Sequence, residues 1–255
     1  MNAIFTIARY TLLEILHNRL FWFIGVFFAL TVLLIEFIGE LTIVETNAFQ
    51  SAFLGALLRF SGVVITSLVV ITGMVREFND KGLALILSLP IPRASYFVGK
   101  LIGFSSLAIF LTLSSCLALV PYAPPDQVMI WGVSILCELL IINAFSLACV
   151  LAFEQVTLAV ITTMAFYLLS RGIDTFQSMA LIRELETLGL ADQIIARVID
   201  AIAFILPGLH RFSTSHWLVY HSGTWPMLLP ILGQTLVYLT MLTGIALFDL
   251  YRKDL

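Results

Sequence analysis

The chain consists of long apolar blocks separated by short polar stretches. A hydrocarbon core about 30 Å thick needs roughly 20 helical residues, and a crossing segment must satisfy its own backbone polar groups. Each block therefore predicts a membrane-spanning helix, and short alternating segments typical of a transmembrane barrel do not appear. We expect one all-α integral membrane domain with six transmembrane helices, divided into an entry helix (1–19), spans one and two (20–75), a cytoplasmic loop (76–95), spans three to five (96–170), an outer region (171–226) and span six (227–249).

Two regions outside the six blocks are amphipathic. Residues 1–19 place apolar side chains on one side of a helical wheel and polar ones, such as Arg9 and Glu14, on the other. This pattern predicts an interfacial helix, with an uncleaved first span after it rather than a secretory signal peptide. In the outer region, 173–188 and 194–206 also have helical spacing but are short for a crossing, which predicts re-entrant or interfacial helices before the last span.

The distribution of basic residues predicts the orientation. Arg9 and Arg19 precede the first block and several Lys and Arg residues follow the second, whereas 40–51 holds acids and no Lys or Arg. By the positive-inside rule, both termini and the 76–95 loop are expected to be cytoplasmic. Arg59 lies inside the second block near its outer end, where we expect its side chain to extend to the outer surface.

Composition agrees with the membrane class, since 60% of residues are hydrophobic and 11% are charged. The net charge of −3 gives no indication of a nucleic-acid partner. Cys116, Cys137 and Cys149 fall inside expected spans without metal-ligand spacing, so we expect them to serve as small packing residues. No phosphate-loop, zinc-protease or nucleophile-elbow motif occurs, so we expect no enzymatic activity and no cofactor in this chain.

Two polar residues of the fourth block are candidates for a translocation pathway. An ionised Glu138 facing lipid would cost several kcal/mol, so we expect it to face the bundle, to be paired, or to be protonated. Asn143 lies about 140° further round the helix, so the two form no single polar face. A structural hydrogen bond between helices and a place along a transport path both remain open for Glu138.

Three histidines in the outer region are weak candidates for a metal site. His210, His216 and His221 are irregularly spaced and interleaved with tryptophan and tyrosine. That mixture is more typical of an aromatic belt at the membrane interface than of zinc ligands.

The cytoplasmic loop carries the clearest functional signal. The run Leu83–Leu89 is apolar although it must leave the bilayer, so it needs a protein groove to cover it. Pro90 and Pro92 would end a helix formed by this run and would stiffen the chain where it returns to the membrane. The pattern predicts a contact with a soluble partner protein.

The same loop resembles that of the type-2 ABC exporter permeases, a family of six-span membrane subunits. That family typically shows an acidic residue after the second span, a Leu-rich helix with Gly, a Leu-Pro-x-x-Arg turn and a Gly-Lys pair entering the third span. The matching positions here are Glu77, Gly82, Leu83–Leu89, Pro90 with Arg93, and Gly99 with Lys100. The family's common Gly-Thr pair instead reads Lys81-Gly82.

The resemblance implies a permease that forms a pathway with a second copy, identical or a paralogue, in the cell membrane (the cytoplasmic membrane in a bacterium). A separate ATPase subunit, holding ATP and Mg²⁺, would drive it. The residues that would transmit the drive are Glu77, Lys81, Gly82, Leu85, Leu89, Pro90, Arg93 and, on the tight turn between spans four and five, Glu154. The alternatives are a stand-alone secondary transporter or channel, and a non-transporting membrane anchor for an ATPase that acts on another protein.

Overall fold

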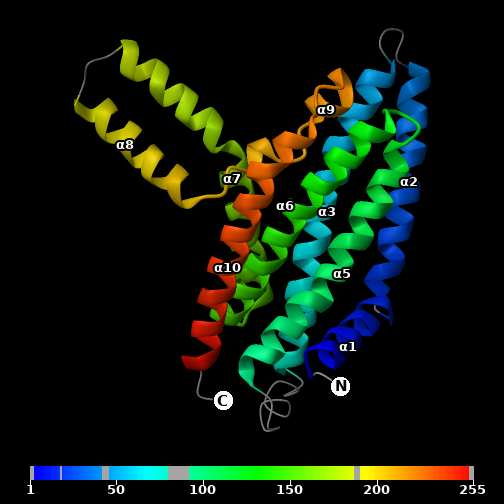
Figure 1. Ribbon diagram of the computed structural model, residues 1–255, viewed down its shortest axis with the longest axis vertical. Coiled ribbons are helices and arrows are strands. Elements are labelled where there is room, and N and C mark those ends of the chain that lie inside the picture. The colour runs from blue at the N-terminus through cyan, green and yellow to red at the C-terminus, as the bar shows by residue number, and fades with distance from the viewer. Residues whose placement is uncertain (1–2, 18, 42–45, 80–91, 187–189, 253–255) are drawn as a thin grey trace.

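A computed structural model describes residues 3–17, 19–41, 46–79, 92–186 and 190–252. Every regular element in these ranges is helical (Figure 1). The elements are α1 (Ala3–His17), α2 (Arg19–Leu41), α3 (Thr46–Asn79), α5 (Arg93–Leu119), α6 (Pro125–Phe153), α7 (Val156–Glu186), α8 (Leu190–Ile205), the 3-10 turn η1 (Leu209–Arg211), α9 (Ser215–Tyr220), the 3-10 turn η2 (Trp225–Met227) and α10 (Leu228–Arg252).

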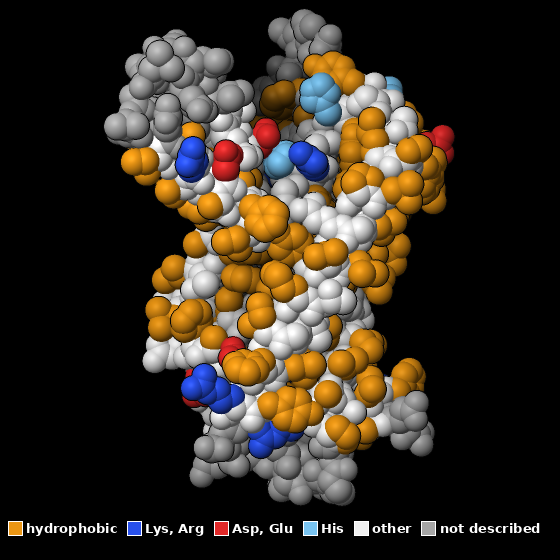
Figure 2. Space-filling model, turned by 60° about the vertical axis from the view of Figure 1, so that its left-hand side comes forward, with side chains coloured by type: hydrophobic (Ala, Val, Ile, Leu, Met, Phe, Trp, Pro, Cys, Tyr) orange, Lys and Arg blue, Asp and Glu red, His pale blue; other side chains and the backbone are white. Residues whose placement is uncertain are grey.

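Five of these helices, α3, α5, α6, α7 and α10, are long and apolar enough to cross a membrane. This agrees with a multi-pass membrane protein. On the face shown in Figure 2, hydrophobic side chains cover the middle of the molecule and charged side chains gather toward its two ends. The first expected span coincides with α2, and its crossing stays a prediction.

The centre of the bundle is α6, which packs against α3, α5, α7 and α10. It is apolar all round, as a helix surrounded by other helices should be, and Trp131, Leu139, Ile142 and Val150 are completely buried. α6 starts after Pro124 with a proline in its first turn, a position that needs no backbone N–H. It ends at Glu154 in the left-handed conformation, φ 54°, and α7 begins two residues later.

α1 packs closely along the first turns of α5. A Cβ built on Gly99 would lie 2.9 Å from Ile7 Cβ, and one on Gly103 would lie 2.6 Å from Thr11 Cβ. The Gly-x-x-x-Gly spacing therefore lets the two backbones approach more closely than side chains would allow. Ala8, Thr11 and Ile15 form the buried side of α1, while apolar residues such as Phe5 and Leu16 are exposed. The face predicted as apolar is thus only partly the face that packs on the bundle.

Three helix boundaries differ from the sequence expectation. The helix of the second span continues past Val75 to Asn79, and the next begins at Arg93, so both ends of the expected 76–95 loop are helical. In the outer region, α7 runs without a break from the fifth span to Glu186, where a separate helix from Ile173 was expected. No proline occurs between Val156 and Glu186, so the helix has no reason to stop at the end of its apolar part.

The C-terminal part of α7 and α8 form a hairpin that projects from the bundle (Figure 1). Ile194, Val198, Phe204 and Ile205 are exposed on α8. The N- and C-termini lie at the opposite end of the molecule, near the ends of α3 and α5 that flank the 80–91 segment. The helical arrangement therefore separates a hairpin end from an end that holds both termini.

Candidate functional site

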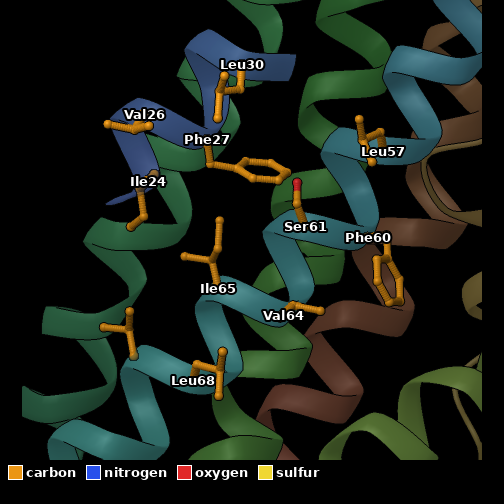
Figure 3. Close-up of a pocket in the computed structure, with 11 residues that line it drawn as sticks. Ile24, Val26, Phe27, Leu30, Leu57, Phe60, Ser61, Val64, Ile65 and Leu68 are labelled. Atoms are coloured by element: carbon orange, nitrogen blue, oxygen red, sulfur yellow. The ribbon is translucent and has the colours of Figure 1, made fainter. Parts of the chain in front are cut away.

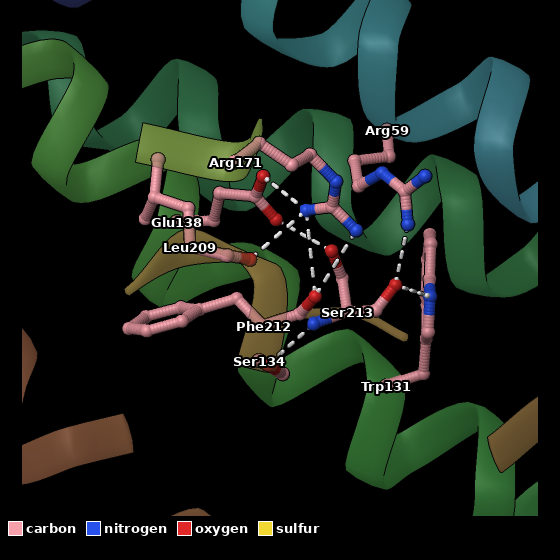
Figure 4. A network of polar contacts seen from close by, with 8 residues as sticks. All are labelled: Arg59, Trp131, Ser134, Glu138, Arg171, Leu209, Phe212 and Ser213. Atoms are coloured by element: carbon pink, nitrogen blue, oxygen red, sulfur yellow. Dashed lines mark hydrogen bonds and ion pairs between the residues drawn. The ribbon is translucent and has the colours of Figure 1, made fainter. Parts of the chain in front are cut away.

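Glu138 is the buried centre of a network of polar contacts between helices (Figure 4). Its side chain, on α6, has no solvent exposure. One oxygen, Oε1, lies 3.1 Å from Nη1 of Arg171 on α7. The other, Oε2, accepts a hydrogen bond from the Ser213 hydroxyl. The prediction that this carboxylate faces the bundle and is paired is confirmed, and Arg171 is the partner.

Residues 209–213, which comprise η1 and the two residues after it, supply the remaining hydrogen-bond partners of the network. Arg171 donates from Nη1 to Leu209 O at 3.1 Å and from Nη2 to Phe212 O at 3.4 Å. The backbone N–H of Ser213 donates to Ser134 Oγ at 2.8 Å. Ser213 is buried in the left-handed conformation, φ 43°, which is uncommon for a non-glycine residue. These contacts supply hydrogen-bond partners to the backbone of an irregular, buried segment.

Arg59 of α3 adds a second guanidinium. It donates from Nη1 to Ser213 O at 2.7 Å, and the indole Nε1 of Trp131 donates to the same oxygen at 3.1 Å. The expectation that Arg59 extends to the outer surface is wrong, because an inward carbonyl acceptor is within reach of its side chain. Arg59 is half-buried and points toward the segment, as Figure 4 shows.

The network joins α3, α6, α7 and the 209–213 segment through two cations and one anion. Removing one member of a buried pair leaves an uncompensated charge at a cost of about 3–5 kcal/mol. The arrangement can therefore act as a clamp that fixes the root of the α7–α8 hairpin against the bundle. The clamp also determines where His210 and Arg211 lie, since both of their neighbours in the chain accept hydrogen bonds from Arg171.

Asn143, the second pathway candidate, takes part in a different contact. Its Nδ2 lies 3.2 Å from Ser105 Oγ and 3.4 Å from Leu101 O, both on α5. Among the described residues its Oδ1 is buried and has no hydrogen-bond partner. Glu138 faces α7 and Asn143 faces α5, which confirms that the two do not share one polar face.

A second ionic cluster lies at the end of the molecule that holds the termini. Lys100 of α5 is 5% exposed, and its Nζ lies 2.6 Å from Glu77 on α3 and 3.7 Å from Glu14 on α1. The same ammonium lies 5.9 Å from the centre of the Phe104 ring. Lys100 thus connects α1, α3 and α5 near the end of α3 and the start of α5.

Arg93, at the start of α5, connects this helix to α10 by a hydrogen bond. Its Nη1 donates to Leu250 O of α10 at 2.7 Å. Glu154 occupies the left-handed turn between α6 and α7, as the tight hairpin predicted from the sequence requires. The remaining coupling candidates, Lys81, Gly82, Leu85, Leu89 and Pro90, lie outside the described residues.

The histidines proposed as weak metal candidates and the three cysteines make packing contacts. In the described part of the chain, no three His, Cys, Asp or Glu residues lie together as metal ligands would, and His216 packs against the Tyr220 ring at 4.6 Å. Cys137 and Cys149 are buried. Cys116 Sγ lies 2.4 Å from the point where a Cβ of Gly132 would stand, so α5 and α6 meet closely there. The packing role expected for the cysteines is confirmed.

One apolar groove lies between α2 and α3 (Figure 3). Its volume is about 580 Å³, and Phe27, Leu30, Phe60 and Ile65 are among its lining residues. Ser61 is the polar residue of the lining, and its hydroxyl donates to Leu58 O of its own helix at 3.0 Å. The groove is suited to hydrocarbon rather than to a polar ligand.

These helices and ionic clusters define a class, the helical multi-pass membrane proteins. A comparison with protein-family models finds no match to the chain, and a comparison with curated proteins finds none either.

Proposed function

We propose that this chain is the membrane-spanning permease subunit of an ABC exporter. In this proposal it works with a second permease copy, identical or a paralogue, and is driven by a separate ATPase subunit that holds ATP and Mg²⁺. The resemblance of residues 76–100 to the loop of the type-2 ABC exporter permeases supports this class. Absence of an ATP-binding motif from the sequence agrees with hydrolysis in a partner.

The observation that carries the proposal is that the helix ends on either side of residues 80–91 are linked to each other; we call these linked ends the tied base of the segment. The helix before it and the helix after it are held together by the ion pair between Glu77 and Lys100, and Arg93 joins the second of them to α10. A partner that pushes on the apolar run Leu83–Leu89 would therefore move four helices, α1, α3, α5 and α10, rather than a loose loop.

The structure changes the part that Glu77 would play. Its side chain is only 14% exposed and its carboxylate is bound to Lys100, so it offers little surface to a soluble partner. In the proposed mechanism Glu77 transmits force by holding α3 to α5. In this proposal the direct contact with the ATPase falls to residues 80–91, together with Glu154 on the turn between α6 and α7.

In the membrane we propose six spans, with α2 as the first, and both termini in the cytoplasm. Arg76, Arg93 and Arg252 lie in the terminal turns of helices on the side of the termini, which fits the positive-inside rule. We propose that α1 lies in the cytoplasmic interface and α8 in the outer one. The exposed Ile194, Val198 and Ile205 of α8 would enter the lipid there.

The first prediction is that the affinity-tagged chain copurifies with a nucleotide-binding subunit from its native cells. We expect Gly82→Pro to abolish this copurification, because a proline would break the helix that the Leu83–Leu89 run is proposed to form. Gly82→Ala, the matched control, should retain the partner. Equal recovery of the ATPase with Gly82→Pro, at equal expression, would remove the segment from the contact; transport by the chain without any ATPase would end the proposal.

A further inference from the structure

A pocket of about 510 Å³ lies between α7, α8, α10 and residues 206–211. None of its lining residues belongs to the Glu138 network. Figure 2 shows, in its upper half, acidic, basic and histidine side chains close together above a hydrophobic surface. A pocket at such a boundary offers a polar and an apolar environment to the same ligand.

Five side chains of the pocket carry hydrogen-bond donors. Those of Gln177 and Tyr238 already donate to Asp200 Oδ1 and Ile205 O, and the other three belong to His210, Arg211 and Gln234. Arg211 donates from Nε to His210 Nε2 at 3.2 Å, which leaves its terminal nitrogens for a ligand. A neutral imidazole that accepts at Nε2 carries its hydrogen on Nδ1. His210 Nδ1 is buried and, among the described residues, has no hydrogen-bond partner.

Gly208 leaves the space between these donors open. A Cβ built on Gly208 would lie 3.7 Å from His210 Nδ1 and 3.8 Å from Gln234 Nε2. The backbone there has φ −73°, which any residue can adopt, so conformation does not require a glycine. The missing side chain matters because it leaves room where two N–H donors converge.

Acidic groups and apolar groups complete the lining. Asp200 of α8 lines the pocket and accepts a hydrogen bond from Gln177 Nε2 at 3.0 Å. Asp174, 62% exposed, is not part of the lining, but it lies 3.7 Å from Nε2 of the lining residue His210. Phe204, 89% exposed, projects from α8 beside them. A ligand in the pocket would therefore meet a cation with neutral donors, carboxylates a short way off, and an apolar wall.

We propose that this pocket binds an amphiphile with a zwitterionic phosphate headgroup, a phospholipid of the ethanolamine type. The phosphate oxygens accept from Arg211, His210 Nδ1 and Gln234, in the space left by Gly208. The ammonium faces Asp200 and Asp174, and the acyl chains leave along Phe204 toward the hydrophobic surface. A guanidinium with neutral donors is a recurrent phosphate-binding set, and the acids favour a headgroup that also carries a positive charge.

The buried network positions this site. Arg171 holds Leu209 and Phe212, the residues on either side of His210 and Arg211, from within the bundle. A ligand in the pocket would thus act on the Glu138 network through one short segment, residues 209–212, next to the α7–α8 hairpin. The inference concerns a ligand of the outer end and does not depend on the proposed ATPase.

The test is native mass spectrometry of the purified chain in detergent, titrated with dihexanoyl phosphatidylethanolamine. Dihexanoyl phosphatidylglycerol and inorganic phosphate are the comparison ligands. We expect the ethanolamine lipid to bind more tightly than either one. Arg211→Gln and Gly208→Val should each weaken it about tenfold or more, since each removes or blocks a charge-assisted contact. Gly233→Val, at a position with no heavy atom within 4 Å of a Cβ, is the matched control.

Each other result overturns the proposal. Equal binding of inorganic phosphate would mean a free-anion site, and equal binding of phosphatidylglycerol would remove the role of the acids. Unchanged affinity in both pocket variants would place the lipid elsewhere. Arg211 is exposed, so its replacement should leave folding intact, and size-exclusion profiles of the variants would verify this.

Discussion

At the scale of single residues, the sequence predicts that the Glu138 carboxylate needs a partner but does not identify that partner. A carboxylate in an apolar block must be paired, and this follows from desolvation alone. Its partner could not be inferred, because Arg171 lies 33 positions away and was placed after the fifth span. A signal was present: Arg171 directly follows an apolar block, and Arg59 lies inside one. Ser213 carried no signal, since its role depends on a left-handed backbone conformation.

The second prediction concerns this ion pair. We expect Arg171→Ala to lower stability by about 3–5 kcal/mol, because it leaves Glu138 buried beside fewer donors. That loss corresponds to a fall in apparent Tm on the order of 10 °C for the detergent-solubilised chain. The double variant Glu138→Gln with Arg171→Ala should recover part of the loss. Arg197→Ala, at an exposed residue of α8, is the control and should change little.

Glu138→Gln alone separates the two interpretations of this residue. If the network is a clamp, the variant folds less stably and transport, where it can be assayed, survives in proportion to the folded protein. A properly folded Glu138→Gln variant without transport would place the carboxylate on the pathway instead.

The third prediction is a pH dependence at His210. Burial lowers the pKa of His210, and Arg211 and Arg171 act in the same direction against the nearby Asp174. The folded state therefore binds fewer protons at this site than the unfolded state, whose pKa is about 6.5. We expect stability to be fully present above that pH and to fall as the pH drops through it. Melting curves between pH 7.5 and 5.5 should show a smaller loss for His210→Gln than for the wild type. Equal losses in the two proteins would contradict the assignment.

At the scale of helices, the period of the apolar residues predicted the helices but not all of their ends. α5, α6 and α10 lie close to the expected spans, because prolines or polar turns bound them. α3 and α7 extend beyond their apolar parts, since a helix continues into polar sequence when no residue stops it. Apolar patterning reports burial in lipid or protein, and it does not report where hydrogen bonding ends.

The fourth prediction tests the packing of α1 on α5. A methyl group at position 103 would stand 2.6 Å from Thr11 Cβ and 3.1 Å from Ala8 O, so Gly103→Ala should force α1 away and lower the apparent Tm. Gly244→Ala on α10 is the matched control, because no heavy atom lies within 4 Å of its Cβ. The control should be neutral or gain up to about 1 kcal/mol from helix propensity. The same response in both variants would show that the close approach does not matter.

At the scale of the whole molecule, composition and block length predicted the helical membrane class, and five helices of spanning length agree with it. The two ionic clusters were not predicted as clusters. The motif contains Lys100 but does not indicate its partners, because Glu77 and Glu14 lie on two other helices that only the fold brings beside it. Pairing over such sequence distances is set by tertiary packing, which hydropathy does not encode.

The central claim is that the tied base of the 80–91 segment transmits the movement of an ATPase to the rest of the bundle. The most direct measurement, and the fifth prediction, is the distance between spin labels at Tyr220→Cys in the two copies of the purified complex. Tyr220 is exposed and is the last residue of α9, a helix at the end of the molecule far from the termini (Figure 1). We expect the distance distribution to change when ATP and Mg²⁺ are added.

Lys100→Met should retain the ATPase, because residue 100 is buried and cannot touch a soluble partner, yet it should lose most of the ATP-dependent change. The account predicts a shift in the wild type that the variant lacks. A wild-type distribution that is identical with and without ATP, in a complex that contains the ATPase and hydrolyses ATP, would contradict it.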